Sequence, residues 1–373
     1  MVDLFFTIFW FLTVFGVKIK GIDNFFFDYM ELEDTNCIKG IFVWLIIFCH
    51  KISYGNQKKY LYYKIAYNLG QKVVSIFFFY SSFGICESIK KKGFDYTKTL
   101  KNKAIIIFLK SQIIILMFLI TNIFILKNKV TLQTYILSII FKSSLGNSNW
   151  FAFTIIILYF YSYFSFGLAK NNIFLGIIII SLLCFLHTKI VYFYYYPKKI
   201  YAVDTILCFV IGFYFSYMKI YLDKIIMKND IFYFGILSAT ILSFYKSSKI
   251  NTLFFKNIRN ALFALLVVFI SMKIKLKNDF LKYLNVHSYS IYLLQRLVFL
   301  IIYKMRIFIN SGFIQIFFEF SSIFCIASLF DKYAVYLNKI FSKKKFIPKT
   351  KYIQLNKEKY IILKDKNNIF SKD

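Results

Sequence analysis

Long apolar runs, separated by short lysine-bearing segments, constrain this chain more than any other feature. A helix needs about 20 mainly apolar residues to cross a bilayer, and about 17 is the lower limit. The mean hydropathy of the 373 residues is +0.61, and 17% of them are charged, whereas soluble domains carry about 25%. This pattern excludes an ordinary water-soluble domain. We therefore expect an all-α, polytopic integral membrane protein.

The apolar runs predict about 11 transmembrane helices, within a range of 10–12. The stretch 130–141 is short and begins with polar residues, so we expect an interfacial or re-entrant piece there; if it spans, it is the twelfth helix. The first run lacks a basic leader and a small-residue cleavage site, so we interpret it as a retained helix. The expected spans are 2–17, 38–54, 72–89, 104–126, 150–169, 173–191, 204–221, 230–246, 260–276, 288–304 and 313–331.

Two lysine-rich segments predict the orientation of the chain. Six lysines lie in the segment 90–103, which we interpret as a loop, and twelve lie between Lys332 and the end. Lysine-rich loops stay on the cytoplasmic side of a membrane. With eleven spans, the N-terminus then lies outside. We expect a membrane-embedded domain over residues 1–333 and a basic cytoplasmic tail over residues 334–373.

The net charge of +31 does not indicate nucleic-acid binding. Only three of the 48 basic residues are arginines, and the lysines are spread over many loops with no basic helix or zinc module beside them. We expect contact with anionic membrane lipid instead, and no nucleic acid. The six cysteines form no CxxC pair and favour free buried thiols. The three histidines are scattered, so we expect no metal site.

The stretch IKGIFVWLIIFCHK, residues 38–51, carries a lysine and a histidine inside an apolar run. Eleven residues make about three helical turns, so Lys39 and His50 lie on one face, about 16 Å apart. Histidine is well suited to accept a proton from a hydroxyl near neutral pH. A cation three turns away suits the anionic part of a long substrate. The plainer alternative makes Lys39 a snorkelling anchor and places His50 among lipid headgroups.

Several stretches resemble the acyltransferase-3 family of integral membrane O-acyltransferases. TNCIKGIFVWLIIFCHKISY resembles the family's pattern of a basic residue, ten intervening residues and a histidine, with Lys39 where arginine is usual. VVSIFFFYSSFGICESIKKKG, from residue 73, is similar to its FF-x-x-SG-F segment, with Ser82 in the glycine position. NWFAFTIIILYFY, from 149, is similar to its Trp-Phe helix. DTILCFVIGFYFS, from 204, is similar to its F-x-x-G helix. HSYSIYLLQRLVF, from 287, is similar to its S-x-x-IYL-x-H segment, with Gln295 in the histidine position.

The resemblance implies transfer of an acyl group, most often acetyl, from cytoplasmic acyl-CoA to a hydroxyl of a cell-surface carbohydrate or its lipid-linked precursor. It covers residues 34–331 and implies a multi-pass enzyme of a bacterial inner (cytoplasmic) membrane. Acyl-CoA would be a co-substrate, with no tightly bound cofactor and no metal. His50 would act as the catalytic base.

Charge and position suggest the remaining site residues. Lys39 and the lysines of segment 90–103, including Lys103, are placed to attract the phosphates of the donor. An ionisable group inside a span, such as Lys110, is a functional hypothesis by default, with snorkelling to the interface as its alternative. We expect the acceptor site to be lined by Tyr289, Tyr292, Gln295, Arg296 and Trp150, although an aromatic belt also explains Trp150.

A transporter or flippase for a lipid-linked glycan, or a glycan polymerase, is the alternative reading. A transporter is expected to show two halves with matching broken helices, and none is evident in the sequence. A polymerase is expected to carry a large outward loop with charged residues, and the outward segments here are short.

Overall fold

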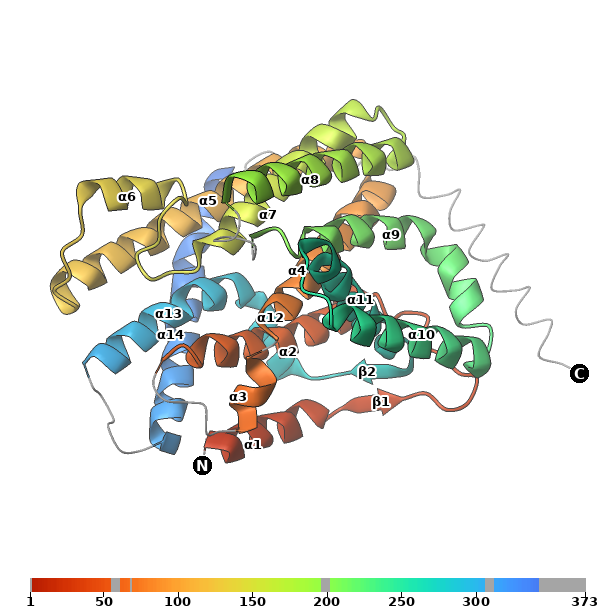
Figure 1. Cartoon of the computed structure of the whole chain (residues 1–373), viewed down its shortest axis with the longest axis horizontal. Coiled ribbons are helices and arrows are strands. Elements are labelled where there is room, and N and C mark those ends of the chain that lie inside the picture. Colours follow the sequence, from red (N-terminus) through yellow and green to blue (C-terminus); the bar gives the residue numbers. More distant parts are fainter. Residues whose placement is uncertain (1, 55–60, 68, 196–201, 306–311, 342–373) are drawn as a thin grey trace, which may run out of the picture.

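The computed structural model describes residues 2–54, 61–67, 69–195, 202–305 and 312–341, and 81% of the structure is helical, as the ribbon in Figure 1 illustrates. This confirms the expected all-α class. The α-helices are α1 (Val2–Val14), α2 (Leu32–Lys51), α3 (Leu61–Ala66), α4 (Gly70–Lys92), α5 (Thr97–Ile120), α6 (Leu132–Ile139), α7 (Asn149–Leu168), α8 (Ile173–Tyr195), α9 (Ile206–Ile226), α10 (Asp230–Ser248), α11 (Leu253–Lys273), α12 (Asp279–Val286), α13 (Ser288–Lys304) and α14 (Gly312–Phe341).

Within the described residues, seven helices are long and apolar enough to cross a membrane, or eight if the bent pair α12–α13 forms one span. The chain is therefore a multi-pass membrane protein, but the predicted count of about 11 is not confirmed. Three expected spans differ for clear reasons. Helix α1 is 13 residues long, α2 carries four charged residues at Glu33, Asp34, Lys39 and Lys51, and serines, tyrosines and charged ends dilute the apolar character of α10.

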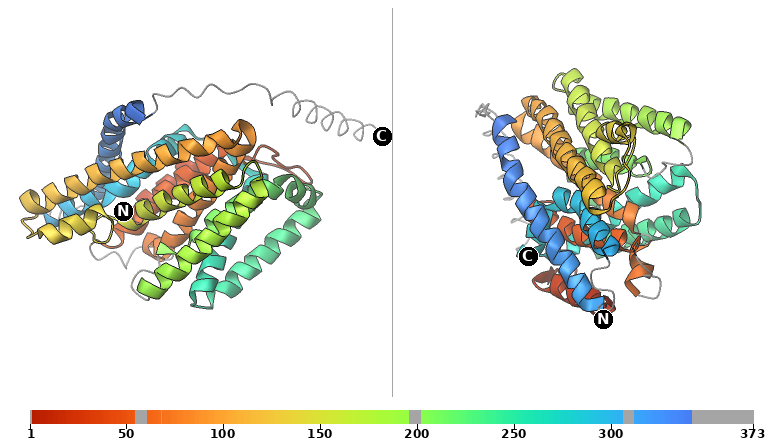
Figure 2. Two further views of the ribbon diagram at one scale, coloured as in Figure 1. Left: turned by 90° about the horizontal axis from the view of Figure 1, so that it is seen from above. Right: turned by 90° about the vertical axis from the view of Figure 1, so that its left-hand side faces the viewer.

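Glycine is needed at two positions where helices pack closely together. A Cβ built on Gly212 of α9 would lie 2.4 Å from the main-chain oxygen of Phe79 in α4, so no side chain fits where these helices meet. A Cβ on Gly40 of α2 would lie 2.1 Å from the main-chain oxygen of Leu281 in α12. These contacts bring α4 against α9 and α12 against α2. Helix α14 runs along the outside of one side of the bundle (Figure 2).

A two-stranded antiparallel sheet joins distant parts of the chain. Strand β1 (Val17–Ile19) pairs with β2 (Ile274–Leu276), and the two strands lie side by side at one edge of the molecule (Figure 1). These strands were not expected from the sequence. Each has only three residues, and the two paired segments are separated in the chain by helices α2 to α11.

The lysine-rich segment and the tail also differ from expectation. The predicted loop 90–103 is mostly helical, because α4 continues to Lys92 and α5 begins at Thr97, with a single 3-10 turn, η1 (Phe94–Tyr96), between them. Helix α5 ends in a short π-helical segment, η2 (Thr121–Ile125). Helix α14 continues past residue 334 to Phe341, and the rest of the predicted tail lies outside the described residues. The stretch 130–141 holds only the short helix α6.

Candidate functional site

A cavity of about 240 Å³ lies among five helices in the interior of the bundle. Its walls come from α2, α4, α5, α7 and α13, and most of its lining derives from four of the five stretches singled out in the sequence, 35–54, 73–93, 149–161 and 287–299. Most of the lining is aliphatic or aromatic, and the polar exceptions are Ser81, Lys110, Tyr159, Ser288, Tyr289 and Tyr292.

The cavity has a polar end and an apolar end. At the polar end, the Ser81 hydroxyl and the Lys103 ammonium face Tyr159. At the apolar end, the ring of Phe151 lies 4.8 Å from the ring of Tyr292, centroid to centroid. The ring centroid of His50 lies 5.5 Å from that of Tyr292. His50 itself therefore sits just beyond the apolar end of the cavity.

Lys39 and His50, the two predicted site residues of α2, lie on the same face of this helix. Lys39, Val43, Ile46 and His50 recur at spacings of four, three and four residues, which places them on one helical face. Val43 and Ile46 line the cavity, so this face forms one of its walls. Lys39 is half-buried, and it has no hydrogen bond or ion pair among the described residues. Its ammonium group is therefore available to an anionic ligand.

Gln295 of α13 is the direct partner of His50. The Gln295 side chain is fully buried, and its Nε2 lies 2.6 Å from Nδ1 of His50. The same nitrogen donates to the main-chain oxygen of Tyr292 at 3.1 Å. Arg296 is the charged group that faces His50, and its Nε is buried without a hydrogen-bond partner in the described structure. The predicted residues Gln295 and Arg296 are thus brought together with His50.

Lys110 and Tyr289 line the cavity but already have partners. Lys110 Nζ lies 3.0 Å from Oδ1 of Asp331 in α14, which also binds His287 Nδ1 at 2.7 Å. The Tyr289 hydroxyl lies 2.6 Å from the hydroxyl of Ser111 in α5. Sequence reasoning missed Asp331, although a carboxylate inside an apolar run was a usable signal.

Two other predicted residues lie at the edges of the site. Lys103 donates to the Tyr96 hydroxyl at 2.6 Å and lies over the Tyr96 ring. Trp150 is half-buried at the start of α7. The cavity wall at this point is formed by its neighbour Phe151, whose ring meets the Trp150 ring edge-on at 6.3 Å.

A buried ion pair next to His50 was not expected from the sequence. Lys51 of α2 pairs with Glu319 of α14, and both side chains are almost completely buried. Lys51 also donates to the Tyr303 hydroxyl at 3.3 Å, and Gln315 donates to Glu319 at 2.9 Å. The pair holds α2 against α14 directly beyond His50. Glu319 lies in the middle of an apolar run, which is the signal that should have identified it.

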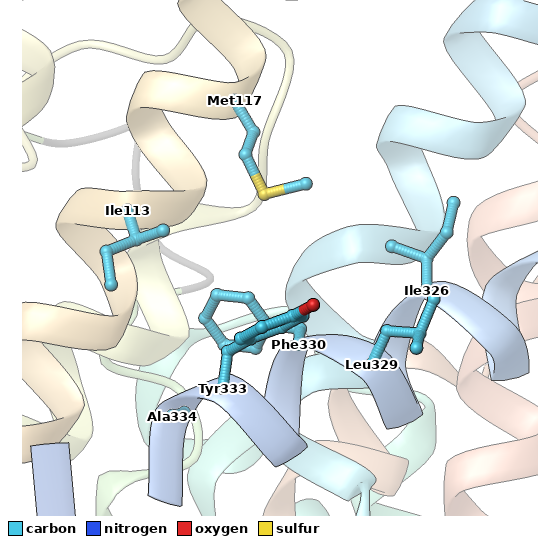
Figure 3. Close-up of a pocket in the computed structure, with 7 residues that line it drawn as sticks. All are labelled: Ile113, Met117, Ile326, Leu329, Phe330, Tyr333 and Ala334. Atoms are coloured by element: carbon cyan, nitrogen blue, oxygen red, sulfur yellow. The ribbon is translucent and has the colours of Figure 1, made fainter. Parts of the chain in front are cut away.

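A larger hollow, of about 510 Å³, lies between α5 and α14 (Figure 3). Its lining side chains are apolar apart from the single hydroxyl of Tyr333, and they project from the two helices toward one another. It offers no acid, base or cation, so it is a less suitable reaction site than the cavity beneath His50.

All six cysteines are free. Five of them are buried, as the sequence predicted, but Cys325 is exposed, contrary to the prediction. Among the described residues, no group of three or more histidine, cysteine, aspartate or glutamate side chains is arranged to hold a metal ion. Comparison with protein-family models, with curated proteins and with solved structures finds no match for this chain.

Proposed function

We propose that this protein is a membrane-embedded O-acyltransferase, which moves an acyl group, most simply acetyl, from acyl-CoA to a hydroxyl of a cell-surface carbohydrate or its lipid-linked precursor. The observation that carries the proposal is that four of the five stretches that resemble the acyltransferase-3 family, although far apart in the sequence, supply most of the wall of one cavity beneath His50; the fifth, from residue 204, does not line it. Resemblances that arose only from the abundance of phenylalanine and tyrosine would be scattered over the bundle.

The distribution of charge around the cavity suits a long donor with an anionic head. Lys110 lines the cavity, Lys103 lies near Tyr159 in its wall, and Lys39 lies about three helical turns from His50 along α2. Lys39 has no partner among the described residues, whereas Lys103 and Lys110 are held by Tyr96 and Asp331. We assign the first contact with the donor phosphates to Lys39, and a longer-range attraction to the other two.

The apolar half of the cavity suits the uncharged arm and the acyl group of the donor. Val74, Phe151 and Ile46 line this half with apolar side chains, and an apolar surrounding slows the hydrolysis of a thioester. An extended arm that starts at Lys39 would run about 16 Å along α2 before it reaches His50. The thioester would then lie next to the imidazole.

The chemical step follows from this placement. The acceptor hydroxyl oxygen attacks the carbonyl carbon of the thioester, and the carbon–sulfur bond breaks. The hydroxyl proton passes to a ring nitrogen of His50, and CoA leaves as a thiolate that takes up a proton. General base catalysis of this kind contributes about 10²–10⁴ in rate. Arg296, which faces His50, is placed to stabilise the negative charge that develops on the carbonyl oxygen.

The test compares surface glycans from cells that express the unaltered protein, His50→Ala or His187→Ala at matched membrane abundance. His187 of α8 binds the Tyr161 hydroxyl at 3.1 Å and lines neither hollow, so it is a matched control. Mass spectrometry should detect the mass of one acyl group with the unaltered protein and His187→Ala, but not with His50→Ala. Equal acylation in all samples would refute the proposal. A shortened glycan, or one that fails to reach the surface, would favour a polymerase or a transporter.

A further inference from the structure

The contact between Gln295 and His50 determines which ring nitrogen carries the proton. A main-chain carbonyl oxygen only accepts hydrogen bonds. The Gln295 atom that lies 3.1 Å from the Tyr292 oxygen must therefore be the NH₂ nitrogen rather than the amide oxygen. Because this nitrogen also lies 2.6 Å from Nδ1 of His50, its second hydrogen points to Nδ1.

An imidazole nitrogen that accepts a hydrogen bond carries no hydrogen of its own. In the neutral ring, the single proton then lies on the other nitrogen, Nε2. In this arrangement Nδ1 is occupied and Nε2 is a donor, so neither nitrogen is free to take a proton from a hydroxyl. A base at this position needs the opposite tautomer, in which Nδ1 carries the proton and Nε2 is free.

We propose that Gln295 is a positioning residue that selects the tautomer of His50: its amide nitrogen holds the ring proton on Nε2 in the resting protein, and a half-turn of the amide stabilises the opposite tautomer, in which Nε2 has given a proton to water, Nδ1 has taken one from water, and Nε2 is free as a base. The second half of this proposal rests on the proposed acyl transfer. The first half does not.

The surroundings of Gln295 allow such a turn but favour the resting arrangement. Its Oε1 is buried and has no hydrogen-bond partner in the described structure, and after the turn it would accept from Nδ1–H. The amide nitrogen would give up its contacts with the Tyr292 oxygen and with Nδ1. The Tyr292 oxygen would keep its place in the hydrogen-bond ladder of α13, because carbonyl i of a helix accepts from the amide of residue i+4. The turn thus exchanges two hydrogen bonds for one, which makes the Nε2–H tautomer the resting one.

The test is ¹⁵N NMR of the full chain, labelled at its histidines and held in lipid nanodiscs. The chain has only three histidines, and His50→Ala identifies the signals of His50. We expect an unprotonated Nδ1 and a protonated Nε2 in the unaltered protein. In Gln295→Met the amide is absent, so the two tautomers should mix. In Gln295→Glu a carboxylate oxygen accepts from Nδ1–H, so the pattern should reverse.

Gln112→Met is the matched control. Gln112 donates to the Ile139 main-chain oxygen at 3.1 Å, so this variant also loses an amide-to-carbonyl bond, but away from His50. Its His50 signals should be unchanged. If Gln295→Glu does not fold, as judged by its thermal unfolding, Gln295→Met decides the question. The proposal would be overturned if the ¹⁵N signals of His50 in the unaltered protein showed a mixture of tautomers or a proton on Nδ1. It would also be overturned if Gln295→Met left these signals unchanged.

Acyl-transfer assays separate this proposal from the proposed function. If both hold, Gln295→Met lowers kcat at least about 10-fold, because it removes the amide oxygen that would accept from Nδ1–H and so stabilise the reactive tautomer, and it leaves KM for acyl-CoA unchanged. If the NMR pattern is as expected but the unaltered protein transfers no acyl group, the proposed function fails and the tautomer assignment stands. If transfer occurs but the tautomer is mixed, the assignment fails and the function stands.

Discussion

Removing either partner of the buried ion pair Lys51–Glu319 should destabilise the bundle by about 3–5 kcal/mol, because the remaining charge stays buried without a counter-ion. The exposed fractions are 1% for Lys51 and 0% for Glu319, so water does not reach either group. Lys51→Met leaves a carboxylate that keeps only the hydrogen bond from Gln315, and we expect a loss near the upper value.

Glu319→Gln should cost less than Lys51→Met. The ammonium of Lys51 keeps the Tyr303 hydroxyl at 3.3 Å and lies 5.8 Å from the ring centroid of Phe299, so it retains a partner and a favourable cation–π contact. The double variant, Lys51→Met with Glu319→Leu, replaces both charges by apolar groups. We expect its stability to be within about 1 kcal/mol of the unaltered protein, since apolar replacement of a buried pair is often neutral.

The assay is unfolding of the purified protein by increasing SDS in mixed micelles, followed by tryptophan fluorescence. Trp44 is a suitable reporter because its ring lies 4.4 Å from that of Phe320, next to the ion pair. Exposed Lys98, which pairs with Asp95, provides the control Lys98→Met, which should leave the unfolding midpoint unchanged because exposed ion pairs contribute little. If each single variant loses less than about 1 kcal/mol, or if the double variant loses the sum of both, the reasoning is refuted.

Three further predictions concern packing, the donor and pH. Gly212→Ala should lower the free energy of unfolding by about 1–3 kcal/mol in the same SDS assay, because its Cβ overlaps the main chain of α4. Lys39→Ala should raise KM for acyl-CoA about 10-fold with little change in kcat, measured by CoA release, because it removes ground-state binding only. Lys275 donates to Asp28 and so holds the pKa of Asp28 below its usual value; this contribution is present above about pH 4 and is lost as the pH falls through the lowered pKa. Asp28→Asn should remove it, and the change in SDS stability at pH 7 should be below about 1 kcal/mol, because the Asp28 side chain is 45% exposed.

Each of the three predictions, at Gly212, Lys39 and Asp28, has a control and a result that would contradict it. Gly235→Ala, at a position where a Cβ meets no atom within 4 Å, should be harmless, and equal losses for both glycines would exclude the packing argument. Lys189, exposed on α8, is the control for Lys39; an equal rise in KM for both would indicate general surface charge. For Asp28, a stability that depends on pH in the same way in the variant would contradict the assignment.

Local features of the sequence were enough to predict the class of the fold and one wall of the site. Apolar runs such as 104–126 and 150–169 predict helices because the bilayer leaves no other partner for backbone polar groups. The spacing of Lys39 and His50 places them on one face of α2 because helical geometry depends only on neighbouring residues. The number of spans was less well predicted. Length, charge and polar side chains decide whether a helix can cross a membrane, and they remove α1, α2 and α10 from the candidate spans.

Contacts between distant residues required the tertiary structure. His50 and Gln295 are 245 positions apart, and Lys51 and Glu319 are 268 positions apart. No periodicity links such pairs, because helix directions and depths are set by packing, as at Gly212 and Gly40, and not by the local sequence. The sequence therefore determined that His50 lies in an apolar helix and faces the same way as Lys39. Only the packing of α13 against α2 decided that an amide nitrogen meets its ring.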